Sequence, residues 1–79
     1  MTPKALDERS LIALVQAGAV HEVLATRDGL RGDYSLSVRV GLRLVPLRSQ
    51  RDPVRLWRSL DGITTFCERV GIRRVLVEL

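Results

Sequence analysis

The chain has 79 residues, a formal net charge of +4 and 46% hydrophobic residues. This length allows one folded domain, because two smaller units could not each bury a stable core. A single cysteine and a single histidine exclude an internal disulfide and a Cys/His zinc site, which are the usual staples of small domains. Aromatic residues make up only 4%, so we expect an aliphatic core and further stabilisation by self-association.

The basic residues are concentrated in one stretch. Residues 1–38 hold four basic and five acidic residues, residues 39–58 hold six arginines and one aspartate, and residues 59–79 hold three of each. The local charge of +5 in the middle stretch could meet a phosphate backbone or an acidic protein. The alternative is that frequent arginine reflects a GC-rich genome and a solvated surface.

The compartment can be predicted from three features. No apolar run is long enough to cross a membrane. The polar start of the chain lacks the apolar region of a signal peptide, and the lone Cys67 fits a reducing environment. We therefore expect a cytoplasmic protein with no membrane partner and no cofactor.

A first helix is predicted over residues 8–17, with Asp7 as its N-cap and Gly18 just past its end. Its apolar stripe comprises Leu11, Leu14 and Val15. Residues 1–6 would then be a loose arm. An earlier start is the alternative, with the Thr2-Pro3 pair at the cap and first helical position.

Two strands and a hairpin are predicted next. Residues 20–27 form a strand, residues 28–33 form a loop rich in Gly and Asp, and residues 34–40 alternate apolar and polar side chains. Gly41-Leu42 fits a type II′ turn. This turn pairs Val40 with Arg43, Val38 with Val45 and Leu36 with Leu47, and places Arg39, Leu44, Pro46 and Arg48 on the opposite face. Proline in the returning strand predicts an open edge or a bulge.

The second half contains a turn at 49–53, a short strand at 54–58, a helix at 60–70 and a last strand at 73–78. Ser59 caps the helix, Gly71 ends it, and Ile72 supplies an apolar contact beyond it. The expected buried stripe is Leu60, Ile63, Cys67 and Val70, flanked by Phe66. The prediction is one α+β domain spanning residues 1–79, with a mainly antiparallel sheet in the order α-β-β-β-β-α-β.

Four short patterns carry a family resemblance: Gln-Ala-Gly-Ala-Val at 16–20, Ser-Val-Arg-Val-Gly at 37–41, Val-Arg-Leu-Trp-Arg-Ser-Leu-Asp at 54–61 and Val-Gly-Ile at 70–72. Together they resemble small partition-associated proteins of the ParC type, found on plasmids and integrative elements. These residues are turn, cap and core residues rather than catalytic ones. The resemblance implies a cytoplasmic protein of a mobile element that is connected with DNA maintenance or its regulation.

No catalytic residue and no metal site is predicted. Cys67 on the apolar stripe of the second helix is interpreted as a core residue, and His21 at the start of a strand as a surface residue. The aspartates, namely Asp28, Asp33, Asp52 and Asp61, occupy turn or cap positions. The Arg-Gly-Asp tripeptide at 31–33 is interpreted as chance. A cysteine enzyme is the least favoured class.

The predicted nucleic-acid or partner-binding site consists of Arg39, Arg43, Arg48, Arg51, Arg55 and Arg58. Spaced guanidinium groups on a sheet face can contact phosphates. The alternative is that they only solvate the sheet. Tyr34 and Trp57 could stack on bases, although Trp57 is better explained by packing between strand and helix.

The last strand is the predicted dimer interface, through Val75, Leu76, Val77 and Leu79. An exposed edge strand can pair with its own copy across a two-fold axis. We therefore expect a homodimer and a non-enzymatic accessory or regulatory protein. Its first candidate partner is DNA, contacted through the arginines. The alternative is an adaptor or inhibitor that binds a partition, nuclease or defence protein, with an acidic surface as a candidate target.

Overall fold

The computed structural model describes residues 4–28 and 32–79, and it has the predicted α+β fold. The chain order is α1 (Glu8–Gln16), β1 (Glu22–Asp28), β2 (Asp33–Val40), β3 (Arg43–Pro46), β4 (Leu56–Trp57), α2 (Leu60–Val70) and β5 (Leu76–Glu78). This confirms the predicted order of helices and strands. The described residues do not include residues 1–3 of the expected arm or residues 29–31 of the expected loop.

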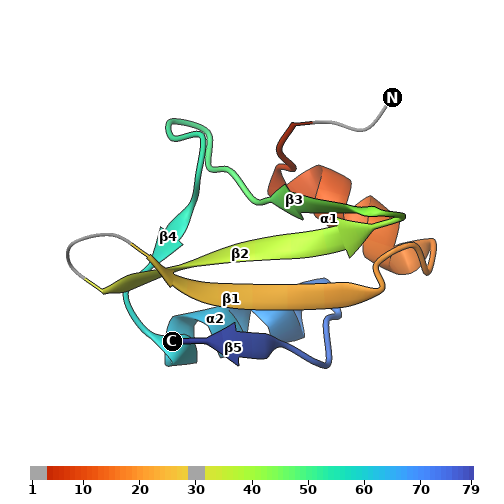
Figure 1. The fold of residues 1–79 in the computed structure, drawn as a ribbon. Helices are drawn as coiled ribbons and strands as arrows, with labels where there is room; N and C mark the ends of the chain where they lie inside the picture. The colour runs from red at the N-terminus through yellow and green to blue at the C-terminus, as the bar shows by residue number, and fades with distance from the viewer. Residues whose placement is uncertain (1–3, 29–31) are drawn as a thin grey trace.

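The sheet is mixed, with β2 in its interior (Figure 1). β1 pairs antiparallel along one side of β2, and β5 then pairs parallel to β1. On its other side β2 pairs antiparallel with both β3 and β4. Figure 1 shows both helices behind the sheet. The result is two layers, with one sheet face covered by helices.

β3 and β4 act as one edge strand that is interrupted by a loop. The backbone N–H of Leu47 donates to the carbonyl of Leu36 at 2.9 Å, and the carbonyl of Leu47 accepts from the N–H of Arg55 at 2.9 Å. Residues 48–55 therefore leave the edge and return to almost the same point. The strand predicted over 54–58 is reduced to the two residues of β4 because this loop takes up its beginning.

The helix caps follow the predictions closely. Asp7 accepts a hydrogen bond from the N–H of Ser10 at 2.8 Å, and the later helix start is correct. Ser59 caps α2 in the same way. Gly71 has φ +91°, a left-handed conformation that other residues adopt at a cost. The second helix has the predicted bounds.

The β2–β3 hairpin confirms the predicted register of Val40 with Arg43 and of Val38 with Val45. Gly41 has φ +62°, whereas no described residue other than glycine has a positive φ. This combination matches a type II′ turn and excludes type I′. The alternation of antiparallel hydrogen bonds places the nitrogen of Pro46 on the side away from β2. Proline therefore occupies an outer edge, as predicted.

Two expectations about packing are wrong. Leu6, placed in a loose arm, is 3% exposed and forms a parallel bridge with Leu47. Its N–H donates to the carbonyl of Pro46, and its carbonyl accepts from the N–H of Arg48, so burial and hydrogen bonding hold the arm at this point. Leu60, placed in the buried stripe of α2, is 37% exposed, because it lines the groove that opens between α2 and β5.

Two strands are shorter than predicted. The first begins at Glu22 rather than at residue 20, because the turn after α1 continues through Ala19, whose N–H donates to the carbonyl of Leu14. The last pairs only over Leu76–Glu78 rather than from residue 73. Residues 73–75 serve instead as the connection from α2 to the sheet.

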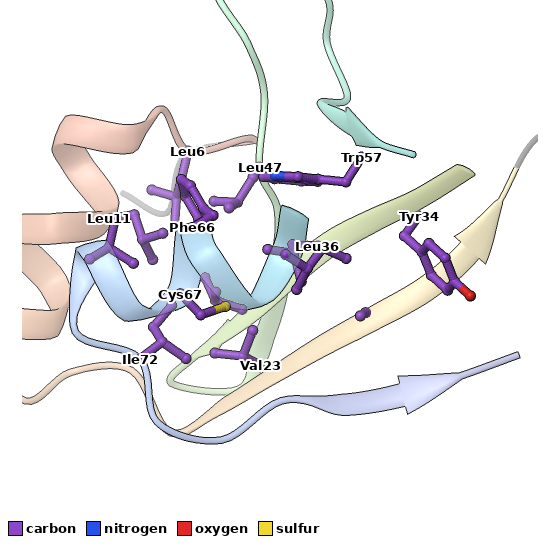
Figure 2. Packing of buried hydrophobic residues seen from close by; sticks show 14 of the residues in the cluster. Leu6, Leu11, Val23, Tyr34, Leu36, Leu47, Trp57, Phe66, Cys67 and Ile72 are labelled. Atoms are coloured by element: carbon purple, nitrogen blue, oxygen red, sulfur yellow. The ribbon is translucent and has the colours of Figure 1, made fainter. Parts of the chain in front are cut away.

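The core lies between the helices and the covered face of the sheet (Figure 2). Leu11, Leu36, Leu47 and Val38 are fully buried. Phe66 belongs to the buried stripe of α2, and its ring centroid lies 5.1 Å from that of Trp57. The tilted geometry of this pair adds to the hydrophobic gain from burial. Trp57 is buried, as the packing interpretation predicted. Neither helix, within the residues described, has the length and apolar character needed to cross a membrane.

Candidate interaction surfaces

The six predicted arginines do not share one face. Arg39 lies on β2 and faces away from the helices, whereas Arg43 occupies the end of the hairpin. Arg51 is exposed in the 48–55 loop, and Arg58 is exposed between β4 and α2. The expected arginine-rich sheet face is therefore not formed. The arginines of the +5 stretch lie instead on the β2–β3 hairpin, in the 48–55 loop and in the connection from β4 to α2.

Arg48 and Arg55 lie against the start of α1. Arg48 Nη2 is 3.5 Å from Asp7 Oδ2, and Arg55 Nη1 is 3.3 Å from Glu8 Oε1. Arg69 of α2 also pairs with Glu8, with Nη2 at 3.1 Å from Oε1. The sequence interpretation missed these partners, since the carboxylates precede the arginines by about forty or more positions.

These contacts change the titration of both carboxyl groups. Hydrogen bonding from the Ser10 N–H and hydroxyl lowers the pKa of Asp7, with a smaller contribution from Arg48. The Arg69 hydrogen bond is the main cause that lowers the pKa of Glu8, and Arg55 adds to it against the opposing effect of burial. Both groups are thus held in their charged form, facing the positive end of α1.

Arg55 has an additional structural role. Its guanidinium carbon lies 4.8 Å from the ring centroid of Trp57 and 4.8 Å from that of Phe66. Arg69 approaches the same Phe66 ring at 5.3 Å. Cations at these distances are attracted by the ring electrons. Arg55 is therefore a packing residue at the border of the core more than a free ligand for phosphate.

The face of the sheet that the helices leave uncovered is called the open face below. The strand registers place on it Glu22, Leu24 and Thr26 of β1, Asp33, Ser35, Ser37 and Arg39 of β2, Leu44 and Pro46 of β3, Leu56 of β4, and Leu76 and Glu78 of β5. Three leucines from three strands are exposed there: Leu44 by 42%, Leu56 by 51% and Leu76 by 57%. Leu44 and Leu56 lie along one edge of this face and Leu76 along the other. Exposed apolar side chains on an uncovered sheet face favour an interaction surface.

The open face is almost free of net charge near its centre. Arg39 is its one arginine, and the register places Glu22 directly opposite on β1. Between the leucines the strands carry the short side chains of Thr26, Ser35 and Ser37. Short side chains keep such a surface flat. The open face therefore combines exposed leucines on its outer strands with short hydroxyl side chains between them, which is more typical of a protein interface than of a phosphate-binding surface.

The predicted dimer residues lie at the other edge of the sheet. Within the described residues β5 pairs only with β1, and all three of its residues are exposed. Leu79 is 88% exposed, Val77 is exposed and Val75 is half-buried. A groove of about 760 Å³ runs between α2 and β5, and its apolar lining includes Leu60, Ile63 and Val77. The edge is thus flanked by apolar side chains on both faces.

The remaining candidates give no catalytic grouping. Cys67 is buried in the core, as predicted, and burial raises the pKa of its thiol. His21 is exposed just before β1. Tyr34 is buried, so its ring is not available for stacking on a base. Over residues 4–28 and 32–79, no three His, Cys, Asp or Glu side chains come together in a way that could hold a metal ion.

Comparison with known proteins gives no match: none is found among protein-family models, curated proteins or solved structures. The resemblance to ParC-type proteins therefore stays a prediction. The candidate surfaces rest on the geometry of this chain alone.

Proposed function

We propose that the protein is a non-enzymatic binding module that contacts a protein partner through the open face of its sheet. The observation that carries this proposal is the exposure of Leu44, Leu56 and Leu76 on three different strands of one uncovered face. Apolar groups in water are stabilised by about 25 cal/mol for each Å² that a partner covers. This corresponds to the adaptor or inhibitor function predicted as the alternative from the sequence.

The distribution of charge favours a protein over DNA as the partner. Binding to a phosphate backbone requires several cations on one surface. Of the six arginines, Arg48 and Arg55 pair with carboxylates of α1, whose Asp7 caps the helix. Arg39 and Arg43 lie on the β2–β3 hairpin, and Arg51 and Arg58 are exposed in the 48–55 loop and between β4 and α2. The open face itself carries Arg39 opposite Glu22. The exposed leucines on its outer strands fit apolar side chains on a protein.

The cellular setting that we propose for this binding comes from the resemblance to ParC-type partition-associated proteins. A small cytoplasmic accessory protein of a mobile element would act by occupying a surface of a partition, nuclease or defence protein. The open face supplies such a surface without any catalytic group. The short side chains between its leucines leave room for a helix or a sheet of the partner laid across the strands.

Site-specific photo-crosslinking in the cells that produce the protein tests the proposal. A photoreactive phenylalanine analogue is placed at Leu56 or at Leu44, and the control carries it at Gln16, which is exposed on α1. We expect a covalent adduct with one protein from both leucine positions and none from Gln16. The captured protein should bind the purified chain, and Leu56→Glu should weaken that binding by about tenfold or more.

Three outcomes would count against the proposal. Equal adducts from Gln16 and Leu56 would show that the open face has no special role. Duplex DNA binding that falls steeply with salt, survives Leu56→Glu and is lost in Arg43→Glu would favour the DNA function instead. An adduct of twice the mass of the chain would report self-association through the open face rather than a different partner.

A further inference from the structure

We propose that two copies of the chain associate by antiparallel pairing of their β5 strands, in a register centred on Leu76. The interface would join the two sheets edge to edge. It runs along the β5 edge and shares Leu76 and Glu78 with the open face, but it does not depend on the protein partner proposed above. The occupant of the β5 edge is thus a second copy of this chain.

The two edges of the sheet differ in whether their backbone groups are free to pair with another strand. Along the β3 edge, the nitrogen of Pro46 points outward and cannot donate, and its carbonyl already accepts from the N–H of Leu6. The 48–55 loop then interrupts the edge before β4. β5 has none of these protections among the described residues, because it pairs only with β1. A partner strand can therefore be added at β5 and is blocked at β3.

The residues around β5 are complementary to themselves in one register. An antiparallel pair centred on Leu76 places Leu76 opposite Leu76 of the second copy and Val75 opposite its Val77. The same register brings Arg74 opposite Glu78 of the second copy, and two-fold symmetry makes this contact twice. Opposite charges directly across two strands stabilise the pair, and like charges destabilise it. Both Arg74 and Glu78 are exposed in the single chain.

The pairing would also cover apolar side chains on both faces of the sheet. Leu76 lies on the open face and Val77 on the covered face, and both are exposed. The groove between α2 and β5 contains Val77 and Leu60, so it could receive side chains of the second copy. A two-fold axis perpendicular to the sheet keeps both open faces on the same side. The dimer would then offer one surface of double width to a partner.

A charge-exchange experiment tests this register in solution. Sedimentation equilibrium of the full chain over a range of concentrations should show a monomer–dimer equilibrium. We expect Arg74→Glu alone and Glu78→Arg alone each to raise the dimer dissociation constant by about tenfold or more, because two attractive contacts become repulsive. The double variant Arg74→Glu/Glu78→Arg should restore the dissociation constant to within about threefold of the original.

Arg73→Glu is the matched control, since it makes the same change of charge at a neighbouring exposed residue. In the proposed register Arg73 lies opposite Leu79 and faces no charged side chain, so dimerisation should change by less than about threefold. Circular dichroism verifies that each variant stays folded. A monomer at the highest concentration, or a double variant that dimerises no better than the single ones, would overturn the proposal. So would Arg73→Glu weakening the dimer as much as Arg74→Glu.

Discussion

Arg55 Nη1 lies 3.3 Å from Glu8 Oε1, although the two residues are 47 positions apart in the chain. This contact ties the end of the 48–55 loop to the first turn of α1. The guanidinium carbon of Arg55 also lies 4.8 Å from the ring centroid of Trp57. Trp57 is the last residue of β4, just before the connection to α2. One arginine therefore connects three parts of the fold. Its substitution would change stability as well as any surface contact.

Arg55→Ala is expected to reduce the free energy of unfolding by about 1–2 kcal/mol. The substitution removes both the partly buried ion pair with Glu8 and the contacts with the two aromatic rings. Arg58→Ala is the control, because Arg58 is exposed and should change stability by less than about 0.5 kcal/mol. Urea denaturation of both variants measures the difference. Equal stability of the two variants would contradict the structural role of Arg55.

Glu8 should make stability depend on pH in the acidic range. Its pKa is lowered in the folded chain from the ordinary 4.5, mainly by Arg69 and then by Arg55. A lowered folded pKa means that the stabilisation is complete above the unfolded pKa and is lost as pH falls through the folded value. We expect the free energy of unfolding to decline below about pH 4.5 as Glu8 takes up a proton.

Glu8→Gln provides the comparison for this pH dependence. It removes the titrating group while keeping the shape of the side chain, so stability should be lower near pH 7 and should fall less steeply between about pH 5 and 3. Asp7 also contributes to the acid response, since its pKa is lowered too. A pH profile of Glu8→Gln parallel to that of the unchanged protein would show that Glu8 is not a source of the dependence.

Local sequence signals predicted the elements well because each had a physical cause within a few residues. Asp7 and Ser59 accept backbone N–H groups at helix starts, and Gly71 adopts the left-handed conformation that ends α2. The glycine of the hairpin turn fixed the pairing of Val38 with Val45. Caps and turns depend on nearest neighbours, so the sequence alone could indicate them.

The parts that were missed depend on contacts between distant segments. No local pattern indicates that Leu6 pairs with Leu47 or that Glu8 lies between Arg55 and Arg69. The arginine cluster looked continuous because it is continuous along the chain, whereas the 48–55 loop separates its members in space. On the open face, the hairpin register predicted Leu44 together with Arg39 and Pro46. The positions of Leu56 and Leu76 depend on which strands β4 and β5 join.

Cys67 should react slowly in the folded protein. The thiol is buried and its pKa is raised by burial, so little of the reactive thiolate is present or accessible. With a thiol-specific disulfide reagent at pH 8, we expect modification to follow opening of the fold and to become rapid in urea. Cys67→Ala should keep the fold with a moderate loss of stability. Rapid modification under native conditions would contradict a core position for this thiol.

Gly71 should tolerate substitution less well than Gly18, although both have positive φ, +91° and +70°. A Cβ at Gly71 would lie 3.3 Å from Val15 Cγ1, whereas a Cβ at Gly18 would meet nothing within 4 Å. Left-handed backbone costs an alanine about 1–2 kcal/mol at either site. Gly71→Ala adds crowding at the contact between the end of α2 and α1. Thermal and urea unfolding should therefore rank Gly71→Ala as the less stable variant, and a reversed order would show that Val15 yields without cost.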